Sequence, residues 1–214
     1  MRTRTWSIIG LLVLLLAIVS AVYFVSNQHN TVITVKTNGT DTSVQAASTP
    51  ISVIPEKMVA EMNNRAFNDV ESYTSTVNSL KADMKAIARK YNYTAEVTIN
   101  SQFGTDQLPF PATVSGTSML PTLKDGQNII VLKTSDFKVG DVVVARHPTY
   151  GLIVKRVASI KGDQVYLKGD NRQIQIVGTE TRVVNGGVEQ VTIEKTTLDA
   201  WLPKANVVGV VEGY

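Results

Sequence analysis

Two residues of this chain carry reactive groups in settings that suit nucleophilic chemistry, Ser118 and Lys155. Ser118 lies in residues 115–123, which read SGTSMLPTL. Gly116 permits an unusual backbone angle and Pro121 stops a helix, so the stretch is predicted to be a tight turn that exposes the Ser118 hydroxyl. A serine hydroxyl is a weak nucleophile on its own and needs a nearby base.

The base is best supplied by a lysine, because the two histidines are poorly placed: His29 borders an apolar run and His147 lies in a turn with proline. In residues 152–157, strand alternation puts Lys155 on the same face as Ile153 and Val157. If that face points inward, burial lowers the lysine pKa, and a neutral lysine can take the serine proton. A solvated edge strand and an ordinary loop are the alternatives that these two segments leave open by themselves.

Four motifs occur in order along the chain: SGTSMLPTL at 115–123, GDVVV at 140–144, VKRV at 154–157 and GDNR at 169–172. Together they resemble the successive motifs of type I signal peptidases, a family of serine–lysine peptidases related to the SOS-repressor autopeptidases. The resemblance covers roughly residues 114–171, with a weaker match at 207–209. It implies that Ser118 attacks the scissile carbonyl, that Lys155 is its base, and that the catalytic core is mainly β.

The resemblance also implies supporting residues. Those expected to hold the oxyanion or the site are Gly116, Thr117, Asp170, Asn171 and Thr181, and those expected to bind substrate are Pro111, Ala112, Thr113, Val114 and Met119. The Ser118 backbone N–H is the expected oxyanion donor. Asp170 is expected to hold its loop or to pair with an arginine such as Arg182.

The chain departs from the family's pattern in three places. Gly116 stands where some members have a serine that helps to hold the oxyanion, and Thr179 or Thr181 must supply the hydroxyl that orients the lysine. The spacing between Lys155 and Gly169 is short, so the large inserted domain of many bacterial enzymes is absent.

Composition excludes several other classes of protein. Hydrophobic residues make up 43% of the 214, which rules out wholesale disorder. The net charge of +3 carries no argument for nucleic acid. There is no cysteine, so disulfides and thiolate sites are impossible, and two histidines make a histidine-rich metal site improbable. No metal or other cofactor is expected.

The N-terminus reads as a membrane anchor. Arg2 and Arg4 precede an uncharged, mostly apolar run over residues 6–25. Twenty residues in a helix reach roughly 30 Å, the thickness of the hydrocarbon core of a bilayer. The arginines predict a cytoplasmic N-terminus with all later residues outside the cell membrane. A cleaved secretory signal ending near Ala21 is the competing interpretation.

Residues 55–91 contain no glycine and no further proline, and they predict a long amphipathic helix. A break near Asn63 and Asn64 would give two shorter helices. The stripe favours packing on its own domain, and a coiled-coil dimer is the alternative. The stripe residues recur at spacings of three and four: Val70, Tyr73, Val77, Leu80, Met84, Ile87 and Tyr91.

Short β-type runs separated by Gly-Asp turns follow from residue 94. The fold class is therefore α+β, with an N-terminal transmembrane helix, a long amphipathic helix and a mainly β catalytic domain. The expected divisions are residues 1–26 (cytoplasmic tip and anchor), 27–54 (short strand and Ser/Thr-rich linker), 55–99 (helix and following strand) and 100–214 (catalytic domain).

The function expected is a membrane-bound serine endopeptidase that removes signal peptides from exported precursors. Its partners would be signal peptides and the lipid bilayer, with helix-mediated self-association as a further expectation. One alternative is an autoproteolytic serine–lysine peptidase that cuts its own linker near Ala46 and Ala47. The other is a non-enzymatic envelope protein whose long helix mediates assembly.

Overall fold

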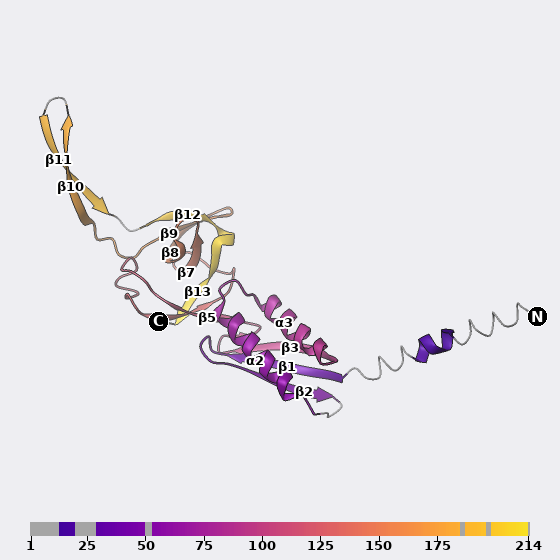
Figure 1. Cartoon of the computed structure of the whole chain (residues 1–214). Coiled ribbons are helices and arrows are strands. Elements are labelled where there is room, and N and C mark those ends of the chain that lie inside the picture. Colours follow the sequence, from indigo (N-terminus) through magenta and orange to yellow (C-terminus); the bar gives the residue numbers. More distant parts are fainter. Residues whose placement is uncertain (1–12, 20–28, 50–52, 185–186, 196–197, 214) are drawn as a thin grey trace, which may run out of the picture.

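The computed structural model describes residues 13–19, 29–49, 53–184, 187–195 and 198–213. Over these residues the chain is α+β, with a four-stranded, a seven-stranded and a two-stranded sheet. Figure 1 shows α2 and α3 beside the four-stranded sheet, while the two-stranded sheet projects away from the seven-stranded one. The predicted fold class is confirmed at this level.

The N-terminal unit comprises the four-stranded sheet, in the order β2-β1-β3-β4, and two helices. β1 pairs antiparallel with β2 and parallel with β3, and the helices form the crossover between β2 and β3. Both helices lie over one face of the sheet (Figure 1). The elements are β1 (His29–Thr37), β2 (Thr42–Thr49), α2 (Glu56–Glu71), α3 (Val77–Lys90), β3 (Tyr93–Ser101) and β4 (Gly104–Thr105).

The core of this unit follows from two periodicities. Ile33 and Val35 alternate along β1 and point towards the helices, as period-two strands require. Met62 of α2 and Met84 of α3 fill the other side and are fully buried. Fully burying one such side chain contributes about 1.5–3 kcal/mol. The rest of this core includes Val44, Met58, Leu80, Ile87, Val97, Ile99 and Leu108.

The prediction of one long helix over residues 55–91 is wrong, because two helices form. The break falls at residues 72–76, and not near Asn63. The Thr76 side chain accepts a hydrogen bond from Ser79 N, and the Ser79 side chain caps the Thr76 N–H, so a capping box starts α3. Tyr73 of the predicted stripe lies in the turn and is exposed. Leu80, like most of the stripe on α3, packs inside the N-terminal unit, as the first interpretation of the stripe expected.

The prediction of a Ser/Thr-rich linker within residues 27–54 is also wrong in part, because most of that segment forms strand β2. The pairing with β1 runs from Asn30 opposite Thr49 to Thr37 opposite Thr42. Threonine is β-branched and suits a pleated strand, so the composition that suggested a loop is compatible with a strand. Val44 is buried in the core, and its N–H donates to the Asn63 side chain of α2.

The seven-stranded unit has the strand order β12-β9-β8-β7-β13-β6-β5, and each pair of neighbouring strands in this order is antiparallel. The predicted strand at residues 128–132 is found with the same bounds. The elements are β5 (Pro109–Thr113), β6 (Asn128–Leu132), β7 (Val142–His147), β8 (Gly151–Lys161), β9 (Gln164–Lys168), β12 (Ala200–Pro203), the 3-10 helix η1 (Lys204–Asn206) and β13 (Val207–Gly213).

A separate hairpin consists of β10 (Gln175–Val184) and β11 (Gly187–Lys195). It extends away from the seven-stranded unit in Figure 1. Near its tip Val183 and Val188 lie opposite each other, and both are exposed.

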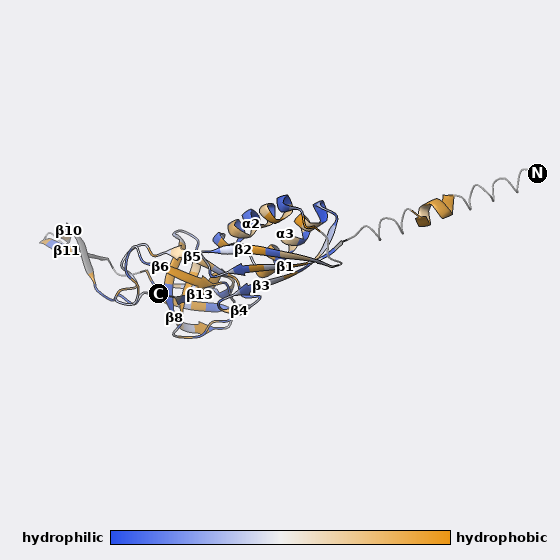
Figure 2. Cartoon of the chain, turned by 90° about the horizontal axis from the view of Figure 1, so that it is seen from below, coloured by the Kyte–Doolittle hydropathy of each residue, from blue (hydrophilic) through white to orange (hydrophobic). Residues whose placement is uncertain are grey.

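Most of the predicted membrane anchor, residues 6–25, lies outside the described residues. Residues 13–19 are described and are helical, and Figure 2 colours them hydrophobic. Within the described part of the chain, no helix has both the length and the apolar character needed to cross a membrane.

Candidate active site

Ser118 is held in a turn between β5 and β6 that is anchored by apolar side chains. Its neighbour Met119 and Leu123 are buried in the core of the seven-stranded unit. Gly116 has φ +92°, in the left-handed region that favours glycine, and its N–H donates to Asp125 Oδ1 at 2.7 Å. Met119 and Leu123 thus fix the turn in the core, while Ser118 is half-buried at its surface.

Lys155 lies on β8, opposite Val143 of β7. Its side chain is buried, with only 4% of the residue exposed, and Val157 on the same face is buried too. Ile153 packs against the same group of apolar residues. The inward orientation that strand alternation suggested is therefore the one the structure has.

The two side chains meet: Lys155 Nζ donates a hydrogen bond to Ser118 Oγ at 2.6 Å. Burial lowers the pKa of Lys155 from its ordinary value, while the negative charges of Asp199 and Asp170 oppose that shift. No carboxylate of the described residues forms an ion pair with Lys155. A lysine in this setting is neutral more often than a solvated one and can accept a proton from the serine hydroxyl.

The loop after β9 holds the serine turn from the other side. Asn171 N donates to the Ser118 carbonyl oxygen at 3.0 Å, and Asn171 Nδ2 donates to the Thr117 carbonyl oxygen at 3.0 Å. These two bonds hold the peptide groups on both sides of Ser118. Asn171 therefore contacts the turn that carries Ser118 through two backbone carbonyl oxygens, one of which belongs to Thr117.

Asp170 pairs with Arg156, and not with Arg182. Arg156 Nε and Nη2 donate to the two oxygens of Asp170 at 2.8 and 2.6 Å, and Thr122 Oγ1 donates to Asp170 Oδ2 at 2.6 Å. The hydrogen bonds from Arg156 hold the pKa of Asp170 below its ordinary value. Arg182 lies on β10 and contacts Glu180 of the same strand. Asp170 therefore ties the strand that carries Lys155 to the turn that carries Ser118.

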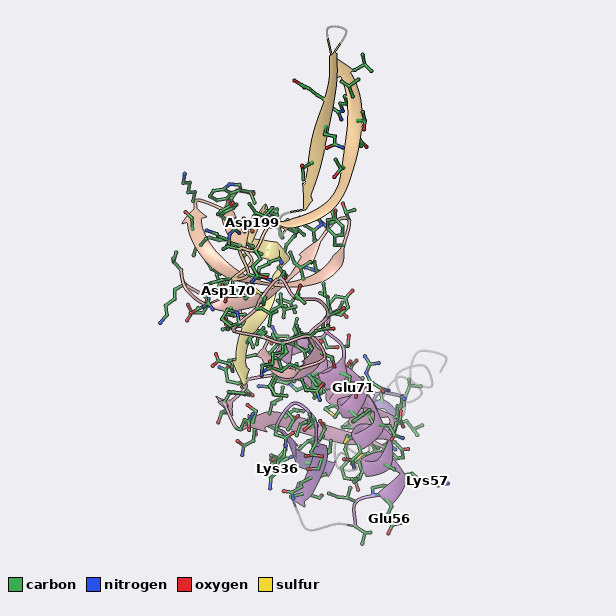
Figure 3. All side chains as sticks on the ribbon, turned by 90° about the vertical axis from the view of Figure 1, so that its left-hand side faces the viewer. Lys36, Glu56, Lys57, Glu71, Asp170 and Asp199 are labelled. Carbon is green, nitrogen blue, oxygen red and sulfur yellow. The ribbon has the colours of Figure 1, made fainter. Side chains whose placement is uncertain are left out.

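Asp199 is a residue of the site that the motifs do not mark. Its Oδ1 accepts the Gly169 N–H at 3.1 Å, and Arg172 Nη1 contacts both of its oxygens. Figure 3 shows the Asp170 and Asp199 side chains in the seven-stranded unit, with hairpin β10–β11 extending away from them. Asp199 sits 30 residues after Gly169 in the chain, and no local pattern indicates that it returns to this loop.

A cleft of about 350 Å³ opens beside the two residues. One wall is the end of β5 and the following residues, and the other is the start of β8. Of the residues expected to bind substrate, Ala112, Thr113 and Val114 line this cleft. The other lining residues are Ser115, Ser118, Ile129, Val144, Tyr150, Leu152, Ile153, Val154, Lys155 and Leu198.

Three expected site residues lie elsewhere. Met119 is fully buried in the core, so the expectation that it binds substrate is wrong. Thr181 is exposed on β10 opposite Gln190, in the projecting hairpin, so it does not orient Lys155. Pro111 pairs with Ile130 of β6 and is not among the residues that line the cleft.

Comparisons with known proteins place this geometry in a family. The family described as Peptidase S24-like matches residues 77–193, which are more than half of the chain. Signal peptidase IB of Staphylococcus aureus (strain Mu50) is 45% identical over 64 residues, which cover 28% of this chain and 34% of that protein. Signal peptidase I of Bacillus licheniformis is 41% identical over 69 residues, or 30% and 37% of the two chains. The matches thus span about a third of the length of these relatives. The chain belongs to the Peptidase S24-like family and is a relative of the type I signal peptidases.

Proposed function

We propose that this protein is a membrane-bound serine endopeptidase that removes signal peptides from exported precursors. The observation that supports this proposal most directly is the 2.6 Å hydrogen bond between Lys155 Nζ and Ser118 Oγ, beside an open cleft. A buried lysine without an ion pair is the environment that a lysine base requires.

The reaction proceeds in two halves through an acyl-enzyme. Ser118 Oγ attacks the scissile carbonyl carbon while Lys155 takes the hydroxyl proton, and the carbonyl oxygen becomes an oxyanion facing the Ser118 N–H. Lys155 then gives this proton to the leaving amine as the C–N bond breaks. In the second half Lys155 takes a proton from water, the hydroxide attacks the ester, and the proton returns to Ser118.

The substrate would bind as an added strand. β5 is the last strand in the order of its sheet and, among the described residues, pairs with β6 only, so its other edge would accept an extended peptide. On the opposite wall, β9 pairs with β8 only from Arg156 onward, so within the described part of the chain no strand pairs with residues 151–155 on that side. A peptide between these two edges would pass Ser118. By resemblance to type I signal peptidases, it would carry small residues at the first and third positions before the cut bond.

The membrane anchor is part of the same proposal. Arg2 and Arg4 before the apolar run of residues 6–25 favour a single span with the N-terminus in the cytoplasm. Protease added outside spheroplasts should then digest the seven-stranded unit, and protection of that unit would contradict the proposed orientation. Recovery of a soluble chain that starts near Val22 would favour the cleaved signal instead.

The test of the activity uses a precursor with a signal peptide and the full-length protein in detergent. Wild type should release the mature form, while Ser118→Ala and Lys155→Ala should each abolish release without unfolding the protein. The double variant should be no worse than either single one, because the two residues act as a unit. Near-wild-type cleavage by a folded Lys155→Ala variant would contradict the proposal.

Self-cleavage has less support from the same geometry. Ala46 and Ala47, the internal target considered from the sequence, lie in β2 and pair with Ile33 and Val32 of β1. A peptide bond inside a paired strand must leave its sheet before it can bind in a cleft. Mass spectrometry of wild type beside Ser118→Ala, both at full length, distinguishes the two activities.

A further inference from the structure

The strand that would bind substrate is built into both units of the molecule. Leu108, directly before β5, is fully buried in the core of the N-terminal unit. Phe110, two residues later, is buried in the core of the seven-stranded unit. Ala112 and Val114 follow and line the cleft. Any displacement of the N-terminal unit would therefore be transmitted along β5 towards Ser118.

A turn of the N-terminal unit packs directly against the start of β5. Residues 38–41 connect β1 and β2, and Gly39 is buried there with φ +99°. A Cβ at Gly39 would lie 3.1 Å from Ile130 Cδ1, 3.2 Å from Ile130 Cγ2 and 3.4 Å from Pro109 Cβ. The turn is held by its own hydrogen bonds, since Asn38 Oδ1 accepts the N–H groups of Thr40 and Asp41 at 2.9 and 2.7 Å. A side chain at residue 39 would therefore require Ile130 to shift by a few tenths of an ångström, or the turn to move away from strands β5 and β6.

Lys133 joins the same strands to helix α2. Its N–H donates to the Leu108 carbonyl oxygen at 3.0 Å, where β5 begins. Its Nζ donates to the carbonyl oxygens of Asp69 at 3.1 Å and of Ser72 at 2.6 Å, at the C-terminal end of α2. Carbonyl groups at a helix C-terminus are orphan acceptors that a lysine satisfies well. Two independent contacts, at Gly39 and at Lys133, therefore hold the base of β5.

We propose that the N-terminal unit positions β5 for substrate binding, and that Gly39 is a positioning residue in this contact. The inference rests on the proposed function, because β5 is taken as the strand that binds substrate. Ser118 lies in the turn after β5, but hydrogen bonds from Asn171 hold that turn from the other side, and Lys155 lies on β8. A change at Gly39 should therefore weaken substrate binding and leave the hydrogen bond between Ser118 and Lys155 unchanged.

The test compares Gly39→Ala with Gly104→Ala in the full-length protein. Gly104 is a matched control, because it belongs to the same unit and has φ +122°, but its nearest neighbour, Gln107 Cγ, would be 3.8 Å from an added Cβ. Both variants carry backbone strain, and only Gly39→Ala pushes on the paired strands β5 and β6, chiefly through Ile130 of β6. Misplacing a substrate by about 1 Å can reduce the rate about 100-fold, so a shift of a few tenths of an ångström predicts a loss in kcat/KM of about 3- to 10-fold.

The kinetic pattern separates positioning from general damage. Gly39→Ala should raise KM, with the pH midpoint of kcat/KM unchanged, and Gly104→Ala should leave both near wild type. Ile130→Ala removes the two closest atoms, so the effect of Gly39→Ala should be smaller in that background. Equal effects of both glycine variants, or no relief by Ile130→Ala, would overturn the proposal.

Hydrogen exchange provides a readout that does not depend on activity. The amides of Phe110, Ala112, Thr113 and Val114 should exchange faster in Gly39→Ala than in Gly104→Ala. If Gly39→Ala fails to fold, Ile130→Ala alone weakens the same contact without a clash and should also accelerate exchange in β5. If Gly39→Ala folds and its β5 amides exchange at the same rate as in wild type, the inference is refuted, whether or not wild type cleaves a precursor. If the β5 amides exchange faster as predicted but wild type cleaves no precursor, only the proposed function is refuted.

Discussion

Replacing Asp170 by asparagine should destabilise the protein measurably, because Asp170 joins three elements. The carboxylate accepts two hydrogen bonds from Arg156, on the strand of Lys155, and one from Thr122, in the turn that follows Ser118. Asp170→Asn keeps the shape and removes the charge. It also turns an NH2 group towards one of the donors, so at least one hydrogen bond of Arg156 or Thr122 is lost.

The size of the effect follows from the geometry. Hydrogen bonds to charged groups contribute about 1.5–3 kcal/mol each. The Arg156 side chain is 35% exposed and Asp170 is 15% exposed, so water replaces part of what is lost. A net loss of about 2 kcal/mol in the free energy of unfolding is the resulting expectation. For a chain of this size that lowers Tm by about 4–8 °C.

The assay is thermal unfolding at pH 7 and at a pH below 3.8, the ordinary pKa of an aspartate. The pKa of Asp170 is lowered in the folded protein, so its contribution is present above 3.8 and is lost as the pH falls through the folded-state pKa. The difference between wild type and Asp170→Asn should shrink on acidification. Asp163→Asn is the control, because the exposed Asp163 carboxylate forms no hydrogen bond or ion pair with the described residues. Equal Tm values for wild type and Asp170→Asn at pH 7, or a difference that persists in acid, would refute the reasoning.

Three further predictions concern activity on a peptide with small residues before the cut bond. kcat/KM of wild type should rise with pH through an apparent pKa below 10.5. Asp199→Asn should lower this apparent pKa, because the negative charge of Asp199 raises the pKa of Lys155; a higher apparent pKa in the variant would contradict this. Lys155→Arg should be inactive at every pH from about 6 to 10, since a guanidinium does not deprotonate there, and an active variant would exclude Lys155 as the base. Thr181→Val should leave kcat/KM unchanged, because Thr181 lies in the projecting hairpin, so a large loss would restore its predicted role.

The correctly predicted parts of the fold are those whose signal comes from residues close together in the sequence. Strand β6 was expected with its actual bounds, because an apolar run between turn residues is a local signal. The inward face of Lys155 follows in the same way from Ile153 and Val157, which are two residues away on either side. The proximity of Ser118 and Lys155 came from the family resemblance, since nothing local joins residues 37 positions apart.

The errors have physical reasons as well. Tyr73 and Val77 continue the helical spacing by coincidence, and the capping box at Thr76 uses serine at a position where glutamate or glutamine is the usual signal. The partner of Asp170 could not be predicted because Arg156 and Arg182 are both nearby in sequence, and only the hairpin's projection carries Arg182 away. Asp199 contacts the loop after β9 from a segment 30 residues further along the chain. No sequence pattern distinguishes it from the other aspartates, so this contact could not be predicted.

The strand order has a consequence for when the enzyme can become active. β13 lies between β6 and β7, so it is the only strand that joins the ladder of β5 and β6 to the ladder that contains β8 within the described sheet. Ser118 follows the first ladder and Lys155 belongs to the second, yet residues 207–213 come after both in the chain. A chain that emerges from the N-terminus onward would therefore carry the serine and the lysine on halves that no backbone ladder yet connects. Order of synthesis would therefore delay the contact between Ser118 and Lys155 until residues 207–213 have been made.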